Sequence, residues 1–290
     1  MAGPQLVVNG DDFGISEEVN EAIVRAFREG ILTSCSLMAT GEAFDHAVRL
    51  ARENPGLGVG LHLVTVLDRP VLPPSALPTI VDGEGRLSSN PPWAGVLYTF
   101  SRRARSELGD ELEAQWRRFE ATGLPCSHVD SHLHMHVTPA IFRIALELAE
   151  RHGIRRMRLP RDPFAPTVRF TRDRLWWTVL MALIFWPLCA SMERKLDARG
   201  IAHTRRVFGN LRTDRMSEAY LLAILEGLTE GTWEVYSHPA LPAAADEARL
   251  SPGRRQQLRE LRMLVSPDVI RRIRELGIEL VNYHGVEAVP

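Results

Sequence analysis

Two adjacent carboxylates stand near the start of this 290-residue sequence, at a place where they could do chemistry. Asp11 and Asp12 lie in the stretch Val-Asn-Gly-Asp-Asp-Phe-Gly of residues 8–14, directly after an apolar run. One carboxylate of such a pair can bind a metal ion while the other acts as a base. A turn with an Asx cap before a helix is the alternative interpretation of the pair.

A second candidate is the nine-residue segment from His128 to His136, which holds five His or Asp residues at alternating positions: His128, Asp130, His132, His134 and His136. In an extended chain all five would project from one face, an arrangement suited to a divalent cation. The segment therefore predicts a metal site. Zinc fits imidazole and carboxylate ligands best; nickel, cobalt, iron and manganese also fit, and magnesium is less natural. A histidine-rich surface loop is the alternative.

Two further histidines follow or interrupt apolar runs. His62 lies inside Gly58–Leu63, where a histidine on its own is typical of a hydrogen-bonded core residue. His238 follows a predicted strand, is followed by Pro239, and has the side chain of a general acid near neutral pH. Since the sequence has no Gly-x-Ser-x-Gly elbow, these residues together predict metal-assisted hydrolysis by water, without a covalent enzyme intermediate.

Short apolar runs alternate with amphipathic stretches along the whole chain, and this predicts an α/β fold with a mostly parallel sheet. Ser16 has the features of an N-cap for a helix that runs to Gly30. Strands are expected at residues 6–9, 33–38, 59–64, 128–131, 156–159, 233–237 and 279–283. About seven such units predict a distorted, TIM-like (β/α) barrel with the site at the carboxyl ends of its strands, and an open doubly wound sheet is the alternative. Residues 69–92 are expected to form a long loop at the rim.

One stretch departs from this alternation. Leu175–Met192 has no charged residue, contains Trp176, Trp177 and Trp186, and has basic flanks. A membrane span here would place two halves of one barrel on opposite sides of the bilayer. We therefore expect an amphiphilic helical hairpin, within an insertion of about residues 164–206, that touches an anionic membrane or covers an apolar substrate with its tryptophans. A buried helix pair or a dimer interface is the alternative.

Composition limits the class of protein. The chain has 35 basic and 36 acidic residues and a net charge of −1, which argues against a nucleic-acid partner. Its 45 % hydrophobic content excludes a disordered chain, and nothing divides residues 1–290, so a single domain is expected. Three scattered cysteines and a start without a signal sequence favour the cytoplasm, with peripheral contact at the inner membrane face. The number of subunits is not indicated.

At these motifs the sequence resembles the YdjC-like carbohydrate deacetylase family. The matching stretches are residues 8–16, 30–48, 58–63, 128–136 and 234–240. The resemblance implies a distorted β/α barrel that hydrolyses the N-acetyl group of an amino sugar, with a divalent metal held by Asp12, His62 and His132. It makes Asp11 the catalytic base and His238 the acid that protonates the leaving amine. His134 and His136 are then left to orient ligands or to contact substrate.

The apolar insertion is similar to that of the hopanoid-biosynthesis-associated branch of this family. This similarity implies an N-acetylglucosamine head group on a hopanoid lipid as the substrate. Three alternatives remain open: a deacetylase of soluble chitooligosaccharides, another metal-dependent hydrolase such as a phosphoesterase or amidohydrolase, and a membrane-associated lipid-binding protein without enzymatic activity.

Overall fold

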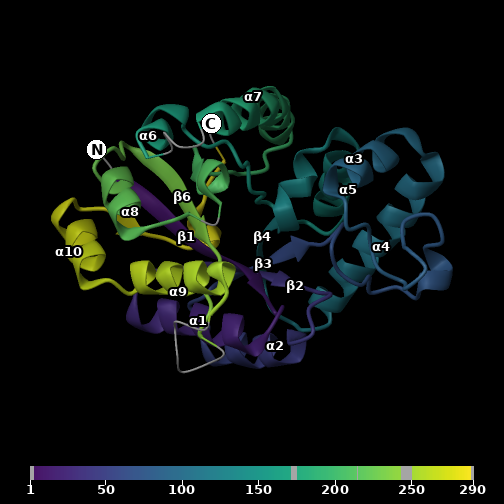
Figure 1. Ribbon diagram of the computed structural model, residues 1–290, viewed down its shortest axis with the longest axis horizontal. Helices are drawn as coiled ribbons and strands as arrows, with labels where there is room; N and C mark the ends of the chain where they lie inside the picture. The colour runs from purple at the N-terminus through teal and green to yellow at the C-terminus, as the bar shows by residue number, and fades with distance from the viewer. Residues whose placement is uncertain (1–2, 171–174, 214, 243–249, 289–290) are drawn as a thin grey trace.

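The fold is a parallel β-sheet surrounded by helices (Figure 1). The computed structural model describes residues 3–170, 175–213, 215–242 and 250–288. The strands run in the order β4-β3-β2-β1-β6-β5, and β7 also pairs with β1. Their bounds are β1 Pro4–Phe13, β2 Ser34–Met38, β3 Gly58–Leu63, β4 Cys126–Ser131, β5 Val207–Phe208, β6 Gly231–Ser237 and β7 Glu279–Leu280.

The helices are α1 Glu17–Glu29, α2 Phe44–Glu53, α3 Pro91–Phe100, α4 Arg102–Glu120, α5 Pro139–Arg151, α6 Phe164–Val168, α7 Leu175–Asp197, α8 Glu218–Leu225, α9 Pro252–Leu264 and α10 Pro267–Glu275. Short 3₁₀ helices follow some strands and loops, among them η1 Pro74–Ala76, η2 His132–Val137 and η4 Asn210–Arg212. The predicted cap of the first helix is confirmed, because the Ser16 side chain accepts a hydrogen bond from the Val19 amide.

The predicted α/β fold with a mostly parallel sheet is confirmed, and the sheet curls into a half-barrel. All residues of β2 and β3 are buried, including Ser34, Ser36 and His62. The expected strand at 156–159 forms no regular ladder and contributes isolated parallel bridges, Val129 with Met157 and Arg156 with Ala202. Between β4 and β5 the described backbone therefore pairs through single bridges, and a complete TIM-like barrel stays a prediction.

The segment expected to be a plain loop is fastened to a helix that the sequence pattern did not predict. Buried Glu111 of α4 accepts hydrogen bonds from the amides of Val71 and Leu72, and Glu107 accepts one from the Thr79 amide. These carboxylates satisfy backbone donors that a loop cannot pair internally. The loop thus has a fixed course beside α3 and α4.

The expected helical hairpin at residues 175–192 is wrong: α7 is one helix of 23 residues that continues through Pro187. A proline inside a helix removes one backbone hydrogen bond and commonly bends the helix without ending it. Among the described residues, α7 is the one helix long and apolar enough to cross a membrane. Of its most apolar 18-residue stretch, 17 % is buried inside the protein. Residues 171–174 of the expected insertion lie outside the described residues.

Candidate metal centre and its pocket

The two adjacent carboxylates have different partners and lie where β1 becomes irregular at its end. The pairing of β1 with β2 shifts register between Gly10 and Phe13, and Asp12 has a φ of 64°. Such a bulge re-aims side chains that would otherwise alternate across the strand. Asp11 is buried, whereas Asp12 is partly exposed.

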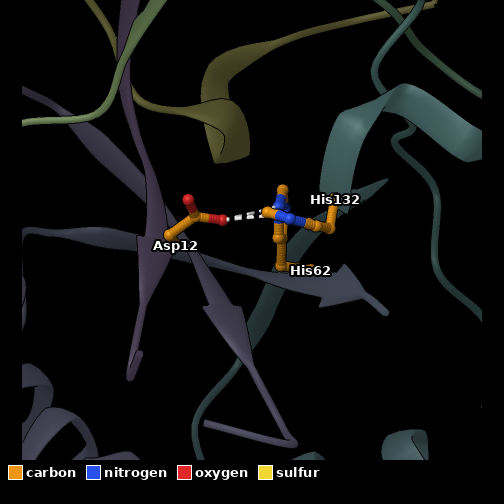
Figure 2. A group of neighbouring side chains, drawn as sticks. All are labelled: Asp12, His62 and His132. Atoms are coloured by element: carbon orange, nitrogen blue, oxygen red, sulfur yellow. Dashed lines mark hydrogen bonds and ion pairs between the residues drawn. The ribbon is translucent and has the colours of Figure 1, made fainter. Parts of the chain in front are cut away.

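Asp12, His62 and His132 come together from the ends of three strands, as the sequence resemblance implies (Figure 2). Asp12 Oδ1 lies 2.9 Å from Nδ1 of His132 and 3.3 Å from Nε2 of His62. One candidate ligand atom from each of the three residues lies within 4.8 Å of the others. This is a donor set of two imidazoles and one carboxylate, which suits zinc and other divalent transition metals.

Asp130 fixes the ring orientation of His62. Its Oδ1 lies 2.7 Å from His62 Nδ1, so the opposite ring nitrogen, Nε2, faces Asp12. A carboxylate behind a histidine ring is the usual support of a histidine metal ligand. Burial lowers the pKa of His62, but Asp130 and Asp12 outweigh it and raise the pKa to about 10. The carboxylates thus make this position favourable for positive charge, and the residues fit a bound cation.

The prediction that the five residues of 128–136 project from one face is wrong. The strand ends at Ser131, and Leu133 and His134 both adopt a left-handed φ of 52° within η2. His128 stacks at 3.7 Å on the Tyr283 ring inside the protein, where burial lowers its pKa to about 3. Of the five, only His132 and Asp130 belong to the cluster around Asp12 and His62.

His134 and His136 have separate environments. His136 is fully buried, with Nδ1 2.6 Å from Ser131 Oγ and Nε2 3.0 Å from the Arg158 carbonyl oxygen, so it braces the turn after β4. His134 packs edge-on against Tyr236 at 4.9 Å, and its buried Nδ1 has no hydrogen-bond partner in the part of the chain that the structure describes. His134 therefore has a nitrogen available to a bound molecule.

Arg158 joins three carboxylates of the site, and sequence reasoning did not single it out. It donates two hydrogen bonds to Asp11, at 2.7 and 2.8 Å, and also contacts Asp130 at 2.6 Å and Glu234 at 2.8 Å. The side chain is fully buried, so its guanidinium compensates the charge of carboxylates that are almost completely buried. The available signal was an arginine beside Met157 and Leu159 in a predicted strand.

A pocket of about 710 Å³ opens beside the cluster. Its polar wall includes Asp11, His134, Tyr236 and His238, and its apolar wall comes from α3 and α7. His238 is near enough to Asp12 to help lower the pKa of that carboxyl, although burial opposes the shift and the hydrogen bonds of His132 and His62 contribute more. The base and acid implied by the resemblance thus line one pocket.

The three tryptophans of α7 do not share one place. Trp177 lines the pocket. Trp176 is 70 % exposed, and Trp186 lies under the Arg161 guanidinium at 5.1 Å; neither is among the lining residues. Contact between substrate and Trp176 or Trp186 therefore stays a prediction without support from the pocket.

Comparison with known proteins places the chain in a family. The family described as YdjC-like protein matches residues 5–275. The chain is 34 % identical to a carbohydrate deacetylase of Brevibacillus brevis over 96 % of its length and 98 % of the relative's. It is 32 % identical to a chitooligosaccharide deacetylase of Enterobacter sp. (strain 638), over 96 % and 97 %.

A crystal structure has the same fold. It is a protein of Enterococcus faecalis V583 with a provisional assignment to cellobiose-phosphate cleavage, and it superposes with a TM-score of 0.74. The match covers 97 % of this chain and 98 % of the other at 24 % identity, and it bears on the fold alone. On the match to residues 5–275 and the full-length relatives, the chain belongs to the YdjC-like protein family.

Proposed function

We propose that the protein is a metal-dependent hydrolase that removes the N-acetyl group from an N-acetylglucosamine head group carried by a hopanoid lipid. Hydrolytic N-deacetylation of carbohydrates is supported by the relatives, which are named carbohydrate and chitooligosaccharide deacetylases. The observation that carries the proposal is the Asp12, His62 and His132 cluster beside a pocket that also contains Asp11 and His238.

Asp12, His62 and His132 are the residues that would hold the metal, zinc in the first place. When bound, a divalent cation polarises a carbonyl oxygen and makes water a better nucleophile. Asp130 contributes by holding the His62 ring in place at 2.7 Å. The donor set also accepts nickel, cobalt, iron or manganese, so the identity of the metal is a question for analysis of the purified protein.

The chain's own residues supply the proton transfers. A water oxygen attacks the acetamide carbonyl carbon, and Asp11 takes the water proton while Arg158 holds its carboxylate by two hydrogen bonds. An amine is a poor leaving group until it is protonated. The His238 imidazolium therefore gives its proton to the amide nitrogen as the C–N bond breaks, and acetate and the free amino sugar result. We assign contact with the sugar to His134, which lines the pocket and whose Nδ1 is unpartnered in the described structure.

The apolar wall supports a lipid-linked substrate. Val96 and Phe100 of α3 face the pocket together with Met181, Phe185 and Leu188 of α7. A sugar ring presents mainly hydroxyl groups, which gain little from such a wall, whereas a polycyclic hydrocarbon next to the sugar would remove apolar surface from water. The hopanoid itself rests on the similarity of the apolar segment to one branch of the family. This assignment places the enzyme in the cytoplasm, at the inner membrane face, with no nucleic-acid partner.

A soluble chitooligosaccharide is the second candidate substrate, because a relative that aligns over nearly its full length is named a chitooligosaccharide deacetylase. The test measures acetate release by zinc-loaded protein from an N-acetylglucosaminyl hopanoid in detergent and, in parallel, from diacetylchitobiose. His132→Ala is the control. Release from the lipid that disappears in the variant supports the proposal. Release from the soluble sugar alone keeps the deacetylase and discards the lipid, and release from neither redirects the search to phosphoesters and other amides.

A further inference from the structure

The mouth of the pocket is bordered by two apolar helices that leave much of their surface uncovered. On α7 the pocket-facing stripe contains Trp177, Met181 and Phe185. Leu180 and Leu183 of the same helix are not among the residues that line the pocket and are exposed; Leu183 is 68 % exposed. A helix on the surface of a soluble protein normally has one apolar stripe and a polar remainder, and α7 departs from this rule.

The helix α3 forms the other side of the mouth and has the same property. Trp93, Val96 and Phe100 recur at spacings of three and four residues and so share one helix face; Trp93 is 58 % and Phe100 81 % exposed. Val96 and Phe100 also line the pocket, so the exposed face of α3 continues into it. In Figure 1, α3 and α7 lie at the upper edge of the molecule. Together these exposed faces form an apolar rim: Trp93, Val96 and Phe100 of α3 with Leu180, Leu183 and Ile184 of α7.

We propose that this apolar rim docks on the surface of an anionic lipid bilayer, so that the pocket mouth faces the membrane from which the substrate's head group enters. This inference rests on the proposed function, because it names the physical state in which the substrate is met. Contiguous exposed apolar surface at a pocket mouth is a mark of an interaction site. Tryptophan is also a residue that proteins place at the boundary between lipid and water.

Exposed basic residues flank the apolar segments of the two rim helices in the sequence, and this charge favours anionic lipid over a protein partner. Exposed Arg102 follows α3 directly, Arg194 and Lys195 come after the apolar part of α7, and Arg169 precedes α7. The nearby carboxylate Glu193 is already paired with Arg161 and Arg206. A protein seated on the rim would cover Phe100 and Ile184 and close the pocket that they line, whereas a bilayer would present the substrate there.

The helix lies on the membrane in this arrangement and does not cross it. Cys189, Met192 and Leu196, in the second half of α7, are buried inside the protein. The exposed part spans residues 175–186, which at 1.5 Å per residue is only about 18 Å long. The hydrocarbon core of a bilayer is about 30 Å thick, so this part is too short to cross it.

The test is co-sedimentation of the full-length protein with vesicles of phosphatidylcholine mixed with phosphatidylglycerol, and with vesicles of phosphatidylcholine alone. The wild-type protein is expected to bind the anionic vesicles more strongly and to bind less at high salt. The double substitution Leu180→Ser/Leu183→Ser is expected to weaken binding about tenfold or more, because it removes two apolar side chains from the buried surface. Trp93→Ser probes the rim independently from α3.

Leu280→Ser is the matched control, because Leu280 is an exposed leucine (36 %) outside the rim. It lies on β7 and pairs with Leu6, near the start of β1, whereas the cluster residue Asp12 is near the end of that strand. Deacetylation of a short soluble N-acetylglucosaminide by the same variants reports on the active site separately. Lost vesicle binding with retained hydrolysis supports the inference even where the lipid substrate proves wrong. Vesicle binding that is absent in the wild type, or unchanged in both rim variants, overturns it. A dimer that dissociates in the rim variants also overturns it and assigns the face to a second copy of the chain.

Discussion

The strand-end cluster and the apolar rim lie near the same pocket and are built in opposite ways. In the cluster each polar group has several partners: Asp130 alone contacts His62, Ser36 and Arg158. In the rim, large apolar side chains such as Phe100 and Leu183 stand mostly in solvent. The cluster is over-determined and therefore rigid, as proton transfer and metal binding require. The exposed apolar surface of the rim, by contrast, contributes favourable free energy only when an apolar partner removes it from water.

Removing a cluster histidine gives the largest expected effect. His132→Ala deletes one imidazole of the donor set, and we expect deacetylation to fall about a thousandfold or more, equivalent to about 4 kcal/mol of lost transition-state stabilisation. Metal content by elemental analysis should fall with it. His284→Ala, in an exposed histidine outside the cluster, is the control. If His132→Ala kept both its metal and its activity, the cluster would not be the metal centre, and the contrast drawn between cluster and rim would be wrong.

Arg158→Met tests the rigidity of the cluster. The substitution leaves Asp11, Asp130 and Glu234 without their shared buried counter-charge. Breaking a buried ion pair by removing one partner costs about 3–5 kcal/mol, so urea unfolding should show a loss of that size or an unfolded chain. Arg25→Met is a matched control, because Arg25 pairs with Glu29 on the exposed face of α1. Equal losses in both variants would contradict the account.

Asp130→Asn tests whether His62 needs the hydrogen bond of Asp130 in order to bind the metal. The amide keeps the size of the side chain but weakens its hold on the His62 ring. Substitutions of such supporting groups typically cost about 10–100-fold in metal affinity or activity. Competition with a chelator of known zinc affinity measures the change. Unaltered affinity would show that His62 needs no support from Asp130.

Asp162 supports the segment around η4, part of which lines the pocket, and makes stability depend on pH. Its buried carboxylate accepts hydrogen bonds from the amides of Gly209 and Leu211, and burial raises its pKa from 3.8 to about 7 despite these bonds. The folded state therefore keeps this proton to higher pH than the unfolded state does. The free energy of unfolding consequently falls as pH rises from the unfolded pKa of 3.8 through the folded pKa of about 7. Between pH 6 and pH 8 the Asp162 contribution to the unfolding free energy should fall by about 1.4 kcal/mol. Denaturant unfolding of Asp162→Asn should lack this part of the dependence; a profile identical to that of the wild type would refute the assignment.

A substitution on the rim side of the pocket should have the smallest effect and the most selective one. Met181→Ser removes apolar contact inside the pocket and is expected to raise KM for a lipid-linked substrate about threefold to tenfold. KM for a short soluble N-acetylglucosaminide should not change. A substitution serves here better than deletion of the segment, because Cys189 and Met192 are buried. Equal changes with both substrates would leave α7 a purely structural role.

The strands could be predicted from sequence because local patterns specify them, and Asp and His residues at strand ends indicated a metal site. The choice of Asp12, His62 and His132 as its ligands came from the resemblance to the family. An apolar run followed by Asp or His marks a strand end, and parallel strands bring their carboxyl ends to one edge. Arg158 and the turn after Ser131 could not be predicted in this way. The burial of Arg158 depends on carboxylates from three separate parts of the chain, Asp11, Asp130 and Glu234. The left-handed φ at Leu133 and His134 belongs to a turn in which His136 contacts the Arg158 carbonyl oxygen, a contact that no local pattern indicates. The sequence did not predict that α7 continues through Pro187, because a proline disfavours the interior of a helix without fixing where the helix ends.

The most direct test of the central claim is anomalous X-ray diffraction at the zinc absorption edge from crystals of the zinc-loaded protein. We predict one strong anomalous peak bounded by Asp12, His62 and His132, and its loss in crystals of His132→Ala. A peak at another place in the protein, or none in crystals of active enzyme, would contradict the assignment of the strand-end cluster as the metal centre.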